Sequence, residues 1–221
     1  MSFLISIPDH ILFEDEYILV VNKPAGLMVE PDRNNHPNLL YQVRNYIKTS
    51  LPPGSEVYAQ HIHRLDRPVS GVILFAKQRS VLKNLSEQFA ERKVQKYYQA
   101  LTSMTPESKK GTLTNWLRKE KKKAIIYDHE HEYSEKVILD YEVADFSKDR
   151  FLWNIQLHTG KYHQIRAQLA HIGCAVIGDE LYGSSILYQK DAIRLHASQL
   201  LFLHPVTKEE MSMRATVDFN L

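Results

Sequence analysis

The sequence predicts an α+β fold: a single domain whose central sheet is mixed but mainly antiparallel and is flanked by helices and loops. Three observations predict it. Several stretches alternate apolar and polar residues, as half-buried strands do, and a few stretches carry apolar residues at helical spacing. The two kinds of stretch do not follow the regular order of a parallel βαβ fold. The chain of 221 residues shows no composition shift that would mark a boundary, so we expect one domain over residues 1–221.

The first third of the chain predicts a strand and a helix. Residues 17–22, YILVVN, form a short run typical of strands, and the turn signal KPAG follows at residues 23–26. Residues 38–48, NLLYQVRNYIK, suit an amphipathic helix that the stretch PPG, at residues 52–54, brings to an end. The apolar stripe of this helix consists of Leu39, Leu40, Val43, Tyr46 and Ile47.

A buried strand and a second helix are predicted next. Residues 72–76, VILFA, are all apolar and follow Gly71, as in a strand that is covered on both faces. Ser80 is the predicted N-cap of a helix over residues 81–93, because its hydroxyl can accept a hydrogen bond from an N–H of the first turn. The apolar positions of that helix are Leu82, Leu85 and Phe89.

The second half of the chain is predicted to be mostly strand. Two runs of period two, at residues 137–143 and 151–157, flank the polar loop DFSKD at residues 145–149. This arrangement predicts an antiparallel hairpin with one face on the core. Residues 162–173, YHQIRAQLAHIG, predict a short helix, and Gly173 is the residue type that commonly ends one.

The charge distribution leaves two interpretations of residues 109–123 open. The net charge is +2, from 28 basic and 26 acidic residues, which does not by itself indicate a nucleic-acid-binding protein. Residues 109–123, KKGTLTNWLRKEKKK, nevertheless hold seven cations against one anion, and the acidic stretch DHEHEYSE follows. A local basic patch can hold phosphates. A solvated, lysine-tipped hairpin is the simpler interpretation.

The cysteine count and the start of the chain predict the compartment. Cys174 is the one cysteine, which excludes an intramolecular disulfide and favours a reducing compartment. Its apolar neighbours predict a small buried thiol rather than a nucleophile. The first 16 residues lack the basic region and long apolar run of a signal peptide, and no stretch is long enough to span a membrane. We therefore expect a cytoplasmic protein with no membrane partner.

Residues 61–77, HIHRLDRPVSGVILFAK, place one carboxylate among cations just before the buried strand. Arg64 and Arg67 stand beside Asp66, and such neighbours can keep a partly buried carboxylate ionised. An ionised carboxylate can act as a nucleophile or a base. By residue type alone, a structural ion pair next to the strand is as good an interpretation. Histidine pairs elsewhere lack the ligand patterns of zinc modules and metalloproteases, so we expect no metal.

Five motifs, in order along nearly the whole chain, resemble those of the RluA-type pseudouridine synthase family. The stretch HRLDRPVSGVILFAK, at residues 63–77, is similar to the family's aspartate motif. The other four are LVVNKPAG at 19–26, similar to its first motif; KYYQA at 96–100, similar to its tyrosine motif; TGKYHQIRAQLAHIGCAVIGDELYG at 159–183, similar to its arginine motif; and LHASQLLFLHPVTKE at 195–209, similar to its closing segment.

The chain departs from the family pattern at three positions. Val69 stands where the family usually has threonine, Gln168 where many members have histidine, and Ala175 where many have proline. We expect these departures to affect the choice of substrate rather than the chemistry. The first motif begins at residue 19. The resemblance is therefore to the form of the family that lacks the separate N-terminal RNA-binding domain.

The resemblance implies an RNA pseudouridine synthase, an isomerase that converts a specific uridine of structured RNA (tRNA or rRNA) to pseudouridine, with residues 1–221 as its catalytic domain. The reaction breaks the bond from the sugar to N1 of uracil and forms one to C5, so it involves no redox change and no cofactor. The rival interpretation is an RNA-binding module that has lost catalysis. A degenerate copy would be expected to lack the aspartate, the tyrosine or the arginine, and all three are present. The expected partner is RNA, and the oligomeric state stays open.

The resemblance also implies roles for four residues. Asp66 is the essential catalytic residue; it attacks the base, attacks the sugar or stabilises a glycal-like intermediate, and each role needs the ionised carboxylate. Arg64 fills the gap that a flipped uridine leaves and holds phosphates, or it pairs with Asp66. Tyr98 stacks on the flipped uracil and can shuttle a proton, with an ordinary core tyrosine as the alternative. Arg166 is expected to pair with Asp66 and keep it ionised, with a surface helix charge as the alternative.

Overall fold

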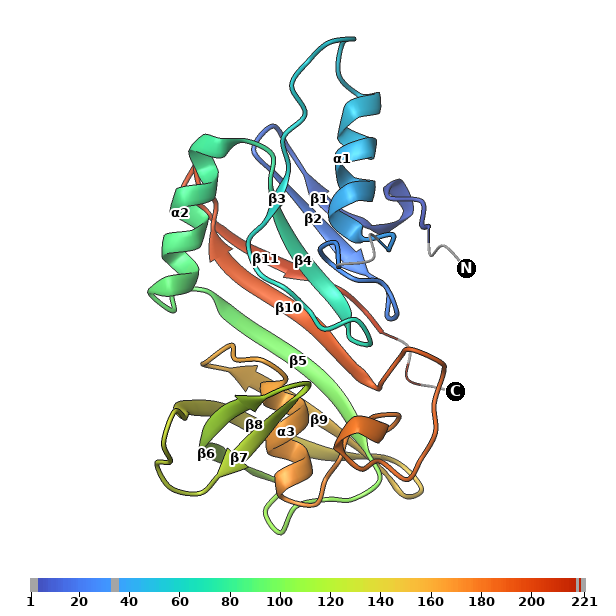
Figure 1. The fold of residues 1–221 in the computed structure, drawn as a ribbon, viewed down its shortest axis with the longest axis vertical. Helices are drawn as coiled ribbons and strands as arrows, with labels where there is room; N and C mark the ends of the chain where they lie inside the picture. Colours follow the sequence, from blue (N-terminus) through green and yellow to red (C-terminus); the bar gives the residue numbers. More distant parts are fainter. Residues whose placement is uncertain (1–3, 33–35, 218, 220–221) are drawn as a thin grey trace. The chain divides into compact units, whose positions relative to one another are not determined.

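A computed structural model describes residues 4–32, 36–217 and 219, and it confirms the α+β fold (Figure 1). The first three residues of the stretch considered above for a signal peptide lie outside this range. The chain folds as two compact units: unit 1 is Met1–Val94 with Ser198–Val217, and unit 2 is Gln95–Ala197 with Asp218–Leu221. No composition shift marks this division. That residues 1–221 act as one catalytic domain stays a prediction.

Unit 1 is a sheet with two helices. Its strands are hydrogen-bonded in the order β1-β2-β4-β10, β3 also pairs with β4, and β11 also pairs with β10. The elements are η1 (Pro8–His10), β1 (Ile11–Glu14), β2 (Ile18–Lys23), α1 (Leu39–Thr49), β3 (Gln60–His61), β4 (Ser70–Ala76), α2 (Arg79–Ala90), β10 (Leu195–Leu203, which begins in unit 2) and β11 (Glu210–Arg214).

Strands β2 and β4 form the centre of unit 1, as their apolar runs predict. They pair antiparallel, with Val20 opposite Leu74 and Val21 opposite Ile73. Alternate residues of a strand point to opposite faces of a sheet, and these four side chains are all buried. Both faces of the sheet are therefore covered here, which explains why both runs are continuously apolar rather than alternating.

The two helices of unit 1 differ in how well their starts were predicted. Helix α1 begins after Asn38, whose side chain accepts a hydrogen bond from the N–H of Tyr41 at 2.9 Å. The prediction of Ser80 as the N-cap of α2 is wrong, because the helix begins at Arg79 and includes Ser80. The chain stays in the sheet up to Lys77, whose N–H donates to the carbonyl of Tyr17 at 2.8 Å. The helix therefore has to start within two residues of the strand.

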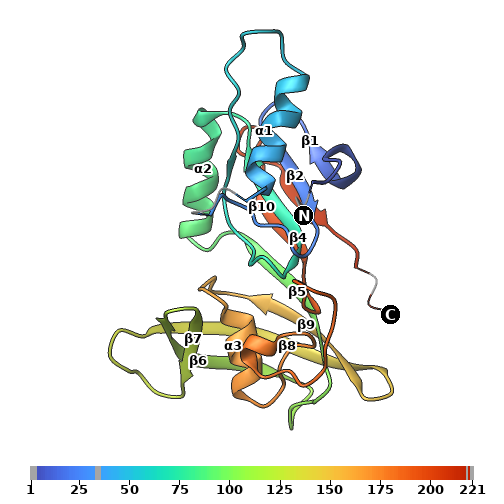
Figure 2. The same ribbon diagram turned by 45° about the vertical axis from the view of Figure 1, so that its right-hand side comes forward.

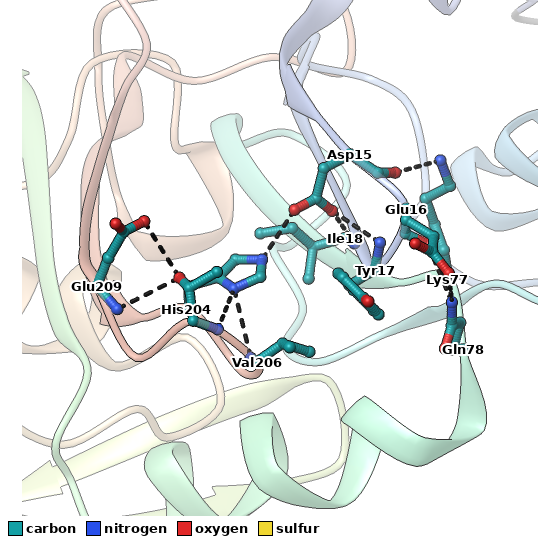
Figure 3. A network of polar contacts seen from close by, with 10 residues as sticks. Asp15, Glu16, Tyr17, Ile18, Lys77, Gln78, His204, Val206 and Glu209 are labelled. Carbon is teal, nitrogen blue, oxygen red and sulfur yellow. Dashed lines mark hydrogen bonds and ion pairs between the residues drawn. The ribbon is translucent and has the colours of Figure 1, made fainter.

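A partly buried polar contact joins the turn between β1 and β2 to the segment after β10 (Figure 3). The carboxylate of Asp15 accepts hydrogen bonds from the N–H groups of Tyr17 and Ile18, at 2.7 and 2.8 Å. It also lies 2.8 Å from Nε2 of His204, a residue 189 positions away in sequence. Nδ1 of His204 accepts from the N–H of Thr207 at 3.0 Å. The imidazole thus ties together two segments of unit 1 that are distant in sequence.

Unit 2 is an antiparallel sheet with one helix against it (Figures 1 and 2). Its strands are hydrogen-bonded in the order β5-β9-β8-β6-β7. Helix α3 contacts β6 and β7, with Ala167 in a small apolar cluster with Leu117, Ala124 and Val137. The elements are β5 (Gln95–Thr102), β6 (Lys110–Glu120), β7 (Lys123–Tyr127), β8 (Glu135–Ser147), β9 (Arg150–Leu157), α3 (Gln164–His171) and η2 (Glu180–Tyr182).

The predicted hairpins and helix of unit 2 are confirmed. Strands β8 and β9 pair antiparallel with Val143 opposite Trp153, and their pairing continues to Ser147 and Arg150, so the turn is tighter than the predicted five-residue loop. The basic stretch 109–123 forms most of the β6–β7 hairpin, with Lys121 and Lys122 at its tip. Helix α3 is followed by Gly173 at φ +77°, the left-handed conformation that favours glycine at a helix end.

Candidate active site

Asp66 lies in a turn immediately before β4 in unit 1. The N–H of Val69 donates to the carbonyl of Asp66 at 3.0 Å, which closes the turn. The side chains of Leu65 and Val69 are buried, whereas Asp66 is half-buried. Two apolar side chains therefore fix this loop on the core and leave the carboxylate within reach of solvent. The strand that follows sets where the carboxylate stands, as the residue order predicts.

The turn after β2 is bonded to the turn that carries Asp66. The N–H of Gly26 donates to the carbonyl of Arg67 at 2.8 Å, and Nε of Arg67 donates to the carbonyl of Gly26 at 3.0 Å. Gly26 has φ +83°, a conformation in which most other residues are strained. The motif LVVNKPAG and the aspartate motif, more than forty residues apart in sequence, are thereby held side by side.

Lys23 stands at the centre of this junction. It is completely buried, and its Nζ donates to the carbonyls of Leu27 at 2.7 Å, Pro24 at 2.9 Å and Arg67 at 3.3 Å. Burial lowers the pKa of Lys23 to about 7, and the charge of Asp66 opposes this lowering. Through these three hydrogen bonds the amine of Lys23 anchors the aspartate loop to the turn after β2. Sequence analysis did not single out Lys23, although it lies inside the quoted motif.

Arg64 forms an ion pair with Glu30, also in unit 1. NH1 of Arg64 donates to one oxygen of the Glu30 carboxylate, and Nε2 of His61 lies 3.3 Å from the other. Burial lowers the pKa of His61, the largest of several effects that partly oppose one another. The side chain of Arg64 is 62% exposed, so it remains accessible to a ligand. Glu30 was not predicted from the sequence.

Arg166 is buried in unit 2, which does not agree with a surface helix charge. Its side chain is 5% exposed and forms two hydrogen bonds to Asp179, from Nε at 2.6 Å and from NH2 at 2.8 Å. The guanidinium also lies over the ring of Tyr182, 5.0 Å from its centroid. A bidentate fork of this kind fixes the plane of the guanidinium. The predicted pairing of Arg166 with Asp66 stays a prediction, and Asp179 is a partner that sequence analysis missed.

Tyr182 connects Arg166 to the basic hairpin. Its hydroxyl accepts a hydrogen bond from the N–H of Ala124, just past the hairpin tip, at 2.8 Å and lies 3.0 Å from Nδ1 of His163. Burial raises the pKa of Tyr182 to about 12. A second hydrogen bond, from the hydroxyl of Tyr162 to the carbonyl of Lys122 at 3.2 Å, reaches the tip itself. The lysine-rich tip is therefore tied to the segment that carries Arg166.

Tyr98 lies on β5, where it is buried and stands opposite Ile155 of β9. This environment suits a ring with a fixed orientation. The structure places Asp66 and Arg64 in unit 1, with Lys23 and Glu30, and it places Tyr98 and Arg166 in unit 2. The roles of these residues toward a substrate stay predictions.

The remaining candidate groups have structural surroundings. Cys174 is buried and burial raises the pKa of its thiol, in line with the predicted inert cysteine. Across residues 4–32, 36–217 and 219, no three His, Cys, Asp or Glu side chains are grouped so that they could hold a metal ion. Among the helices of the same residues, none has the length and apolar character needed to cross a membrane.

Comparisons with known proteins agree with the motifs. A sequence model of the family described as RNA pseudouridylate synthase matches residues 17–171. The chain is 33% identical to the tRNA pseudouridine synthase C of Vibrio parahaemolyticus, over 94% of this chain and 90% of that protein. It is 31% identical to the ribosomal large subunit pseudouridine synthase D of Zymomonas mobilis, over 95% of this chain and 69% of that protein. The solved structure of human RNA pseudouridylate synthase domain containing 4 has a similar fold, with a TM-score of 0.78 at 21% identity over 96% and 90% of the two chains.

Proposed function

This chain belongs to the RNA pseudouridylate synthase family, whose members are isomerases that act on RNA, and we propose that it converts a specific uridine of a tRNA or an rRNA to pseudouridine with Asp66 as the catalytic residue. The match over most of the chain carries the assignment. The names of the relatives support both classes of RNA, because one is a tRNA enzyme and the other acts on the large ribosomal subunit.

The surroundings of Asp66 support a catalytic role for it. Its carboxylate is half-buried, on a loop that two buried side chains and the hydrogen bonds to Gly26 hold in place. Lys23 lies close enough that the charge of Asp66 acts on its pKa. An ionised carboxylate held in a fixed place can attack the uracil or the sugar, or stabilise positive charge on the sugar, with little reorganisation. Each of these roles allows N1 of uracil to leave the sugar and C5 to take its place.

We assign the other motif residues to binding and positioning. Arg64, exposed and next to the aspartate loop, holds phosphate or occupies the space of the flipped uridine. Tyr98 supplies a ring for the uracil, and Arg166 pairs with Asp66 through a guanidinium that Asp179 already orients. We expect the protein to act in the cytoplasm, without a metal or a cofactor.

The replacement Asp66→Asn tests the proposal. The amide has nearly the shape of the carboxylate but cannot be a nucleophile or a base, so we expect turnover to fall on the order of 10³-fold or more while RNA binding persists. Pseudouridine mapping of total RNA from cells with and without the gene first identifies the modified uridine. Purified wild-type and Asp66→Asn proteins are then compared on that RNA.

The rival function is an RNA-binding module without catalysis. It predicts binding of RNA by the wild-type protein with no pseudouridine formed in any RNA, in cells or in the purified reaction. Substantial turnover by Asp66→Asn would instead keep the function and remove Asp66 from its role.

A further inference from the structure

Glu30 divides its carboxylate between two side chains of the aspartate motif. One oxygen accepts from NH1 of Arg64, and the other lies 3.3 Å from Nε2 of His61. Both partners precede Asp66 by five residues or fewer. Glu30 therefore determines where the guanidinium of Arg64 stands when no RNA is present.

The position of Glu30 is fixed by the fold. The two residues before it are bonded to the start of α1, where the N–H groups of Leu39 and Leu40 donate to the carbonyls of Met28 and Val29 at 2.8 and 2.9 Å. His61 is 11% exposed, and within the described part of the chain its buried Nδ1 has no hydrogen-bond partner. An unsatisfied buried nitrogen costs stability. The ring orientation of His61 that leaves Nδ1 without a partner is the one that brings Nε2 to Glu30.

The contact between Glu30 and Arg64 lies at the surface. Glu30 is 40% exposed and Arg64 is 62% exposed. Exposed ion pairs are weak, whereas a guanidinium and a phosphate can form a strong bidentate pair. A phosphate delivered to this place can therefore take the guanidinium from the carboxylate. RNA that binds without a phosphate there meets a negative charge and an arginine that is already engaged.

We propose that Glu30 is a positioning residue that competes with RNA phosphate for Arg64 and so weakens the binding of RNA that does not fit the site. The inference rests on the proposed function, because it takes RNA as the ligand. It extends that function by giving a carboxylate outside the family motifs a part in choosing the RNA. A protein can gain specificity by placing a charge that repels the wrong ligand, and here the carboxylate of Glu30 would repel phosphates of RNA that does not fit.

Binding of two RNAs by Glu30→Gln tests the inference. One RNA contains the uridine that the wild-type protein modifies, and the other is an oligocytidine of the same length. We expect Glu30→Gln to bind oligocytidine about two- to fivefold more tightly, the range that an exposed ion pair allows. The slope of log affinity against log salt should steepen by roughly one unit, because one more cation becomes available to phosphate. The preference for the modified RNA should fall accordingly.

Two controls separate competition for Arg64 from simple removal of a negative charge. In an Arg64→Ala background, adding Glu30→Gln should leave oligocytidine binding unchanged. Glu56→Gln removes an exposed carboxylate of unit 1 that pairs with Arg79 instead, and it should also leave binding unchanged. The inference is overturned if Glu30→Gln has the same effect with and without Arg64, or if it has no effect on oligocytidine. A wild-type protein that forms no pseudouridine would overturn the proposed function, and the oligocytidine measurements would still decide the competition.

Discussion

Replacing Lys23 with methionine tests whether the buried amine of Lys23 holds the aspartate loop. Methionine has an unbranched side chain that fits the same space, but it cannot donate to the carbonyls of Pro24, Leu27 and Arg67. The replacement therefore takes the lysine donor away from the carbonyls of Pro24 and Leu27, whereas the carbonyl of Arg67 keeps its hydrogen bond from the N–H of Gly26. Leaving a buried acceptor without a donor costs roughly 1–3 kcal/mol, and methionine recovers part of this by apolar burial. We expect Lys23→Met to lower the free energy of unfolding by about 2–4 kcal/mol at pH 9.

The effect should depend on pH in a direction that the lowered pKa fixes. The pKa of Lys23 is about 7 in the folded protein, whereas the ordinary value of 10.5 applies to the unfolded chain. Between these two pH values the unfolded chain keeps the proton on Lys23 and the folded chain has released it. The free energy of unfolding contributed by Lys23 therefore rises with pH through this window. From pH 7 to pH 9 the rise is about 2 kcal/mol. The wild-type protein should gain this amount over Lys23→Met.

Urea denaturation of both proteins at pH 7 and pH 9 measures the difference. Lys83→Met removes an exposed lysine of α2 and controls for the loss of one charge. If the stability difference between wild type and Lys23→Met is the same at both pH values, Lys23 stays charged throughout. Three carbonyl acceptors and Asp66 would then outweigh burial, and the reasoning from burial would be refuted.

Three replacements test the other assigned residues on the identified RNA. Tyr98→Phe keeps the ring and removes the hydroxyl; we expect a large loss of turnover with binding retained, and unchanged turnover would limit Tyr98 to stacking. Arg166→Lys keeps the charge but loses the bidentate fork, so turnover should fall by about tenfold or more; wild-type rates would show that Arg166 does not act on Asp66. Neutralising Lys121, Lys122 and Lys123 should weaken RNA binding and reduce the salt slope by roughly one unit per lost phosphate contact; an unchanged slope would make the hairpin tip a solvated loop. Turnover of the triple variant at saturating RNA should barely change.

Most elements of the fold could be predicted because local patterns determine them. The buried runs of β2 and β4 and the stripe of α1 are visible in a few consecutive residues. Ser80 has the residue type of a cap and yet lies inside α2, because the hydrogen bond between Lys77 and Tyr17 fixes where the chain leaves the sheet. A contact sixty residues away in sequence overrides the local preference there. Patterns within a few consecutive residues cannot predict a hydrogen bond between Lys77 and Tyr17.

The candidate site divides in the same way. Asp66, Arg64, Tyr98 and Arg166 could be named because motifs mark their positions. Their partners could not, since Glu30 lies 34 residues from Arg64 and the pairing depends on how the loop before α1 folds back. Lys23 shows a different gap: the motif contains it, but lysines at the end of an apolar run are usually taken as solvated. Its complete burial is a property of the turn after β2 and not of the residue.

Gln168 shows how structure changes the meaning of a departure from a family pattern. Many relatives have histidine here, and in this chain the buried amide accepts from Nε2 of Gln164 at 2.9 Å and donates to Oδ1 of Asn115 at 2.9 Å. A neutral histidine can also donate once and accept once, so either side chain can supply the one donor and one acceptor used at this position. Gln164 and Gln168 lie one turn apart on one face of α3; Gln168 bonds this face to β6, and Gln164 bonds it to the carbonyl of Ile138 in β8. Arg166 stands between them in sequence and so points about 200° around the helix from each. The departure from the family pattern at Gln168 therefore lies on the side of α3 that is bonded to the sheet. The other side, which carries Arg166, matches the arginine motif.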